Sequence, residues 1–453
     1  MQFELTREYI EILRDAIDNQ EKEKAMAMMD ELHAADIAEI YDGLNIDEAK
    51  YLYLLLDGEK AADVLAELEE DDRERFLKVL PSEVIAKEFI NYMDSDDAAD
   101  VLADMPEDKK DEVLSHIEDL DLAGDIVDLL EYNKDTAGGL MGKEYIAVNT
   151  SWDIARCYEE IRAEADEVDD IFDIYVIDDD NKLQGVFSLK ELIVADYEDK
   201  IENVYNKDPH YVKTKMESEE VAHLMDKYDL VTLPVVDDIG RLVGRITIDD
   251  IVDVIRDEAE KDYQMASGIS EDVEYTDSIW RLTRARLPWL MIGLFGGVMG
   301  ARVIGLFEGD LSKNAETALF LPLIAAMAGN VGVQSSAIVV QGLAANTIGL
   351  ESVLKKIMKE ISVALLNGLA CAFIILIYNL IFSDSLALTF SVSISLFIVI
   401  IFASIFGTFV PLALNKLKID PALATGPFIT TVNDITGLAI YLVVSRILFS
   451  FIV

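Results

Sequence analysis

The stretch "GPFITTVNDITGLAIYLVVSRILF", residues 426–449, decides how the C-terminal part of the chain folds. It is long and apolar enough to cross a membrane as a helix, yet it contains Asp434. A carboxylate at the centre of a membrane helix costs roughly 2.5–3.5 kcal/mol on insertion scales, so such acids are functional by default. We therefore expect Asp434 to face an ion path. A protonated Asp434, or one hydrogen-bonded between helices, is the open alternative.

Four other apolar segments precede this one, and together they predict an α-helical membrane domain of five transmembrane helices. The predicted spans are 287–307, 317–345, 357–382, 387–414 and 422–450. Lys and Arg gather before the first span and in the second and fourth loops, and the other two loops hold one Lys. The positive-inside rule then places the N-terminus in the cytoplasm and the C-terminus outside a plasma (inner) membrane, with lipid around the spans.

The charge of the chain is divided as unevenly as its hydropathy. The formal net charge is −48 over 453 residues. Residues 281–453 hold 11 Lys and Arg and 8 Asp and Glu. Residues 1–280 hold 27 Lys and Arg and 78 Asp and Glu, which gives this segment a net charge of −51. So acidic a segment repels nucleic acid and concentrates cations, which excludes a nucleic-acid partner. A heavily solvated surface is the plainer explanation of the same charge.

The acidic part contains two kinds of internal repeat. "AADVLAELEEDDRERFLKVL" at 61–80 returns as "AADVLADMPEDKKDEVLSHI" at 98–117, which predicts an all-α helical-repeat N-domain over 1–135. "YVIDDDNKLQGVFSLKELI" at 175–193 aligns with "PVVDDIGRLVGRITIDDIV" at 234–252 and resembles tandem CBS domains, small α/β modules, over 136–252. An acidic connecting helix at 253–280 and a pore domain at 281–453 complete a multidomain fold.

Polar groups inside the predicted spans indicate what crosses them. "AGNVGVQSS" in the second span and "TGPFITTVNDITG" in the fifth supply amide, hydroxyl and carboxylate oxygens, with no Lys or Arg beside them. Oxygen ligands suit hard cations, and Mg²⁺ keeps most of its water, so one or two carboxylates suffice to bind it. The negative central charge argues against an anion channel.

Taken together, these features resemble the MgtE family of magnesium channels over essentially the whole chain. The most specific elements are "GNVGVQSS" and "GPFITTVNDITG". The resemblance implies a homodimer that imports Mg²⁺, with Asp434 as the central Mg²⁺ site. The implied pore-lining residues are Asn330, Gly426, Thr430 and Asn433.

The resemblance also implies that cytoplasmic Mg²⁺ closes the channel by bridging acidic groups. The implied metal ligands, besides Asp434, are Asp96, Asp100, Glu219, Asp229, Asp250, Glu258 and Asp420. Lys261 is a departure, because an acidic residue is commoner at this place in the connecting helix. We therefore expect fewer metal sites on the last turn of that helix.

The CBS pair raises a further expectation. "SLKE", with Ser188 and Glu191, is similar to the motif with which such modules bind ATP or another adenine nucleotide. Nothing in the sequence indicates catalysis, so we do not expect an enzyme. Two alternatives stay open: a channel for other divalent cations such as Mn²⁺ or Co²⁺, and a membrane-tethered adenine-nucleotide sensor.

Overall fold

The computed structural model describes residues 5–68, 70–164, 168, 171–271, 273, 277–344, 353–424 and 426–452. Position 345, the end of one predicted span, lies outside these ranges. The chain divides into two compact units, Met1–Arg256 and Asp257–Val453, and each is described by itself.

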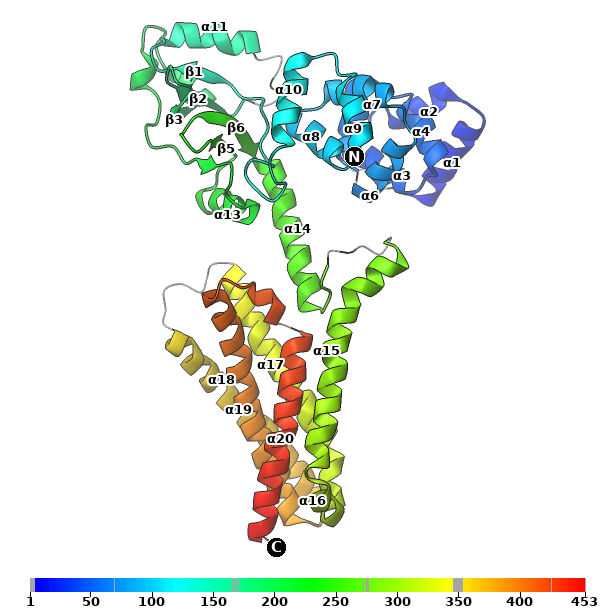
Figure 1. The fold of residues 1–453 in the computed structure, drawn as a ribbon, viewed down its shortest axis with the longest axis vertical. Helices are drawn as coiled ribbons and strands as arrows, with labels where there is room; N and C mark the ends of the chain where they lie inside the picture. Colours follow the sequence, from blue (N-terminus) through cyan, green and yellow to red (C-terminus); the bar gives the residue numbers. More distant parts are fainter. Residues whose placement is uncertain are drawn as a thin grey trace. The chain divides into compact units, whose positions relative to one another are not determined.

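The N-terminal part of the first unit is built of short helices, as the repeat predicts (Figure 1). They are α1 (Arg7–Asp18), α2 (Lys22–Met29), α3 (Ala34–Asp42), α4 (Ile46–Tyr53), α5 (Gly58–Ala66), α6 (Glu70–Lys78), α7 (Ser82–Glu88), α8 (Ser95–Ala103), α9 (Glu107–Leu114) and α10 (Leu120–Leu129). Helices α5 and α8 carry the two "AADVLA" copies, and in both the first Ala, the second Ala, Val and Leu are buried. The repeat is therefore a repeated packing face.

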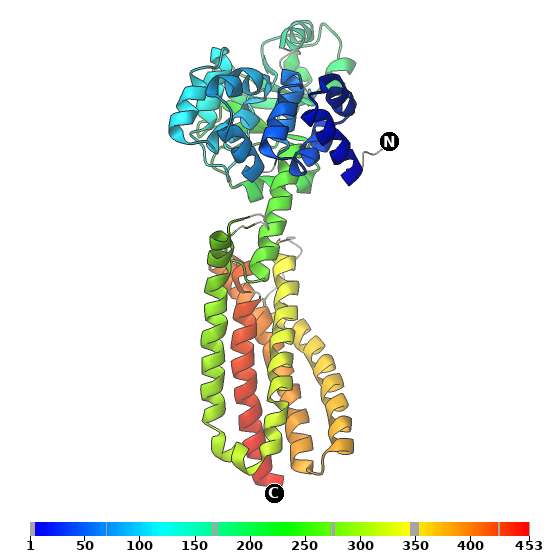
Figure 2. The ribbon, with the colours of Figure 1, turned by 90° about the vertical axis from the view of Figure 1, so that its right-hand side faces the viewer.

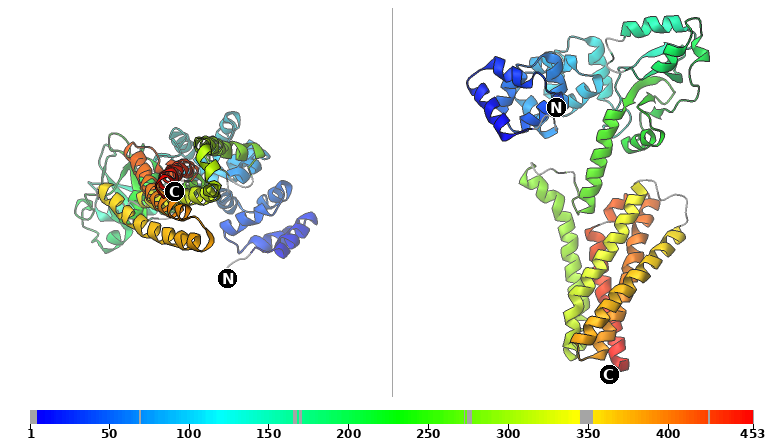
Figure 3. Two further views of the ribbon diagram at one scale, coloured as in Figure 1. Left: turned by 90° about the horizontal axis from the view of Figure 1, so that it is seen from below. Right: turned by 180° about the vertical axis from the view of Figure 1, so that it is seen from behind.

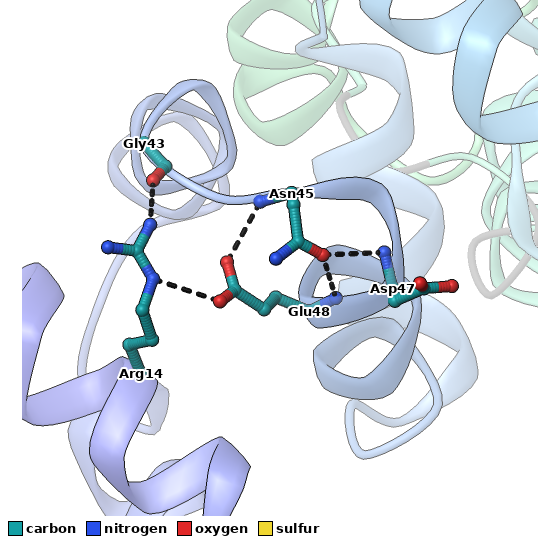
Figure 4. Close-up of polar contacts among 5 residues, drawn as sticks. All are labelled: Arg14, Gly43, Asn45, Asp47 and Glu48. Atoms are coloured by element: carbon teal, nitrogen blue, oxygen red, sulfur yellow. Dashed lines mark hydrogen bonds and ion pairs between the residues drawn. The ribbon is translucent and has the colours of Figure 1, made fainter.

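Local polar contacts fix how successive helices of this domain meet. Asn45 and Glu48 form a capping box that begins α4: the Asn45 side-chain oxygen accepts from the N–H of Glu48 at 3.0 Å, and Glu48 accepts from the N–H of Asn45 at 2.9 Å. Figure 4 shows that Arg14 of α1 donates to the same Glu48 carboxylate at 2.9 Å and to the carbonyl of Gly43 at 2.8 Å. One carboxylate thus caps one helix and anchors another.

The CBS pair consists of two small sheets with the same design. The first copy has β1 (Ala147–Asn149), α11 (Ile154–Glu164), β2 (Asp173–Ile177), β3 (Leu183–Ser188) and α12 (Leu189–Val194); the second has β4 (Val212–Lys213), α13 (Ser218–Tyr228), β5 (Thr232–Val236) and β6 (Leu242–Thr247). In each sheet the first strand pairs parallel with the second and the second antiparallel with the third. The turns contact reciprocally, because the N–H of Leu183 donates to Gly240 and that of Leu242 donates to Asn181. The sequence duplication is therefore a structural one.

Helix α14 (Ile248–Ala266) follows β6 directly and begins inside the range predicted for the CBS domains. The membrane domain then has α15 (Ile279–Gly305), α16 (Glu308–Lys313), α17 (Leu321–Ala344), α18 (Val353–Phe382), α19 (Leu386–Lys416) and α20 (Pro427–Ile452). Five helices in the described part of the chain are long and apolar enough to span a membrane, which confirms the expected five. The first begins eight residues before the predicted start, so Arg281, Arg284 and Arg286 lie on it.

Helix α19 is the most buried span, and α20 packs against α15, α17 and α19. Figure 2 shows α15 and α20 side by side, and the view from below in Figure 3 shows the ends of the same bundle. The stretch that carries Asp434 is therefore surrounded by other helices on several sides.

Candidate functional site

Asp434 lies on α20 where that helix crosses α17. A Cβ atom added at Gly329 of α17 would stand 2.8 Å from Asp434 Oδ1, so a larger residue at this position would make the carboxylate shift. In the described part of the chain, Asp434 pairs with no Lys or Arg. The carboxylate that sequence reasoning singled out is thus held against a helix backbone without a cation of the protein to balance it.

The four residues predicted to line the pore occupy different environments. Asn330 is exposed on α17, whereas Asn433 is fully buried against Gly332 of the same helix. The Thr430 hydroxyl donates to the carbonyl of Gly426 at 2.9 Å. In this chain Asn433 therefore contacts α17, and a pore-lining role for the four residues stays a prediction.

The start of α20 contacts the end of α14 within the second unit. Gly426 has a φ of +57°, and a Cβ atom there would collide with the carbonyl oxygen of Ala266. Gly268 has a φ of +83°, and a Cβ atom there would lie 2.6 Å from Pro427. Both positions require glycine, because a side chain would be strained and would push the two helices apart. Close by in the sequence, exposed Asp420 accepts from the N–H of Ala422 at 2.8 Å.

A cluster of carboxylates lies where the helical repeats meet the segment leading into the CBS pair. One oxygen each of Asp94, Asp96 and Glu144 lies within 4.8 Å of the others, which is a spacing that can hold a metal ion. Ser95 fixes Glu144, since its N–H and hydroxyl donate to the two carboxylate oxygens at 2.9 and 3.0 Å. Sequence reasoning found Asp96 but missed Asp94, two residues before it, and Glu144, which belongs to no motif.

Electrostatics extends this cluster to α14. Burial and the Asp250 carboxylate, in that order, raise the pKa of Asp96 well above its usual range. Burial and the neighbouring Asp249 raise the pKa of Asp250 to about 7, although Thr247 donates to its carboxylate at 2.8 Å. The structure thus brings together Asp96 and Asp250, which are far apart in the sequence, and their negative charges oppose each other. All-carboxylate donors of this kind fit Mg²⁺.

The other predicted metal ligands are not gathered into this cluster. Asp100 lies one turn after Asp96 on α8. Glu219 lies in the first turn of α13 and Asp229 ends that helix, about 15 Å apart at 1.5 Å per residue. Glu258 of α14 pairs with Lys261 at 3.0 Å. The lysine that departs from the family's pattern therefore neutralises this carboxylate.

The predicted nucleotide-binding residues bond to each other. The Ser188 hydroxyl and N–H donate to Glu191 at 3.0 and 2.8 Å, and the Glu191 N–H donates to the hydroxyl, a capping box that begins α12. Ser188 is half-buried at the end of β3, and Glu191 is exposed in the first turn of α12. A ligand that uses them would have to replace these contacts.

Comparison with known proteins covers nearly the whole chain. Residues 321–444 match a family described as a divalent cation transporter, residues 32–135 the MgtE intracellular N domain, and residues 137–198 and 201–257 the CBS domain. The magnesium transporter MgtE of Thermus thermophilus is 32% identical over 96% of this chain and 97% of its own length, and that of Enterococcus faecalis is 34% identical over 96% of each.

A solved structure of the cytosolic domain of the Mg²⁺ channel MgtE in complex with ATP matches with a TM-score of 0.51. It is 33% identical and covers 53% of this chain and 98% of its own. The helical repeats, the CBS pair and the membrane domain of this chain thus each match a family model, and the named relatives match over nearly their full length. The chain belongs to the MgtE family of divalent cation transporters.

Proposed function

We propose that this chain conducts Mg²⁺ into the cell as a homodimer in the plasma (inner) membrane, with Asp434 at the ion path and the C-terminus outside. The observation that carries the proposal is the isolated carboxylate of Asp434 against Gly329. An acid without a cation of the protein would gain from a cation that passes, and Mg²⁺ that keeps its water needs few direct ligands. The magnesium transporters named above, similar over nearly their full length, support Mg²⁺ as the cargo.

The decisive experiment is flux into liposomes that contain the purified full chain. Mg²⁺ entry into vesicles with the protein, and none into empty vesicles, is the expected result. Mn²⁺ and Co²⁺ measured in parallel decide whether the alternative divalent cations are better cargo. A protein that reconstitutes as a folded dimer and moves none of the three would refute conduction and leave the membrane-tethered sensor.

Cytoplasmic Mg²⁺ closes the channel in this proposal. The carboxylates of Asp94, Asp96 and Glu144, with Asp250 next to them, repel one another when no cation is bound. A divalent cation removes this repulsion and stabilises only the arrangement that brings them together. Flux that falls as Mg²⁺ on the cytoplasmic side rises through the millimolar range is the expected result.

An adenine nucleotide at the CBS pair is a second proposed ligand. A similar cytosolic domain has been solved with ATP, and half-buried Ser188 and exposed Glu191 lie where β3 passes into α12. Calorimetric titration of the full chain with ATP tests it: Ser188→Ala should weaken binding at least threefold, and equal binding by both proteins would count against these residues.

A further inference from the structure

A second acid lies within a predicted span, on a helix that sequence reasoning did not single out. Glu360 of α18 accepts hydrogen bonds at one carboxylate oxygen, Oε1, from the hydroxyls of Ser335 on α17 at 2.6 Å and Ser404 on α19 at 2.5 Å. The two hydroxyl oxygens are 3.0 Å apart. Three membrane helices therefore meet at one carboxylate oxygen.

This contact is inside the protein, although α18 is among the most exposed spans. Ser335 and Ser404 are 4% and 1% exposed, and Glu360 is half-buried about 8 Å along the helix from the start of the span at Lys355. In the described part of the chain, Glu360 pairs with no Lys or Arg. The two serine hydroxyls stabilise the Glu360 carboxylate by donating hydrogen bonds to it. The carboxylate in turn supplies the acceptor that holds both serines.

The same region of α17 forms the wall beside Asp434. Three residues before Ser335, the backbone of Gly332 touches Gly407 of α19, and one turn earlier Gly329 touches Asp434 of α20. A displacement of α17 by even a fraction of an ångström would change the space at Asp434, because glycines leave these backbones in direct contact.

We propose that Glu360 is a positioning residue for ion conduction: by holding Ser335 and Ser404 together it fixes α17 between α19 and α20, and so sets the space at Asp434. Glu360 does not touch the ion in this scheme. The inference rests on the proposed function, and it assigns part of the selectivity to a carboxylate outside the ion path. What matters is the acceptor oxygen, since both serines donate to it.

The test compares Glu360→Ala with Glu360→Gln in the full chain in liposomes. Gln keeps an oxygen that accepts both hydroxyls, so it should retain the wild-type ratio of Mg²⁺ to Ca²⁺ flux within twofold, whereas Ala should lower the ratio at least threefold. Asp310→Ala is the matched control: it removes an acid of the same domain that is 2.6 Å from Arg446, and should leave the ratio unchanged.

A wild-type ratio in Glu360→Ala, or an equal loss in Glu360→Gln, overturns the proposal. If the Ala variant does not fold, Ser335→Ala combined with Ser404→Ala removes both donors, and an unchanged ratio in that protein has the same meaning. A wild-type chain that moves no cation refutes the proposed function instead. The role of Glu360 in holding α17 is then tested by hydrogen exchange of the wild type, Glu360→Ala and Glu360→Gln. Backbone amides of α17 should exchange at least threefold faster in Glu360→Ala than in the other two proteins. Equal exchange in all three overturns the positioning role.

Discussion

The carboxylate cluster of the first unit and the carboxylate of Asp434 in the membrane domain differ in how their charge is balanced. Asp94, Asp96 and Glu144 crowd together in the first unit, and burial with Asp250 nearby raises the pKa of Asp96. Asp434 in the membrane domain lies against glycine and pairs with no Lys or Arg of the described chain. Crowded acids gain much free energy from a cation, so they suit a sensor, whereas a lone acid releases its ion more easily, as conduction requires.

The largest expected effect is the loss of Mg²⁺ flux when the isolated acid, Asp434, is removed. Asp434→Ala should lower Mg²⁺ flux at least tenfold, because it removes the negative charge of the proposed ion path. Flux into liposomes measures the effect, and size-exclusion chromatography confirms that the assembly is intact. Asp384→Ala, which removes an exposed acid from the loop before α19, is the control and should conduct as the wild type does. Undiminished flux in Asp434→Ala would remove this residue from the ion path.

Neutralising the crowded site should shift closure and leave conduction intact. In Asp96→Asn combined with Asp250→Asn, the cytoplasmic Mg²⁺ needed to halve the flux should rise about three- to tenfold, which corresponds to roughly 0.7–1.4 kcal/mol of lost coupling. Asp111→Asn with Asp121→Asn removes two exposed acids of the same domain as a control. Closure at the wild-type Mg²⁺ concentration in the first variant would show that the cluster is no sensor.

Protons should imitate Mg²⁺ at the crowded site. The pKa of Asp250 is raised to about 7 by burial, so the folded state binds a proton more tightly than the unfolded state, whose Asp titrates near 4. The contribution of Asp250 to the stability of the first unit should therefore be fully present below about pH 4 and be lost as the pH rises towards 7. Thermal unfolding of the full chain should show a midpoint a few degrees higher at pH 5.5 than at pH 7.5, and a smaller difference in Asp250→Asn. Equal differences would contradict the assignment.

The smallest effect concerns a carboxylate that already has a cation. Glu258 pairs with Lys261 at 3.0 Å on an exposed helix face, and such pairs contribute about 0–1 kcal/mol. Lys261→Glu should place a second carboxylate beside Glu258 and lower the Mg²⁺ concentration needed for closure about twofold. Lys261→Gln separates loss of the pair from gain of an acid. An unchanged closing concentration in Lys261→Glu would show that this turn takes no part in sensing.

The fold was largely predictable from the sequence because repetition and hydropathy act locally. The "AADVLA" copies predict paired helices, and five apolar segments predict five spans. The two CBS-like copies, which begin at residues 175 and 234, predict two equivalent sheets. Asp434 was predictable too, since one acid in an apolar helix is conspicuous without any knowledge of its neighbours.

Contacts between distant segments were not predictable in this way. Glu144 lies near Asp96 only because the linker after α10 returns to α8, and no spacing in the sequence shows that. Asp229 and Glu219 look like neighbours in an acidic segment, yet a full helix separates them. Glu360 follows "LKKIMK" near the start of the predicted span 357–382, and only helix packing shows that it lies against two buried serines.

The apolar cores of the first unit are not divided as its domains are. One continuous core runs from the helical repeats, through Ala137 and Met141, into the second CBS copy, while the first CBS copy packs around a core of its own that includes Phe187. The helical repeats and the second copy should therefore melt as one cooperative unit. The first copy should unfold separately from them, although the two CBS copies are alike in sequence.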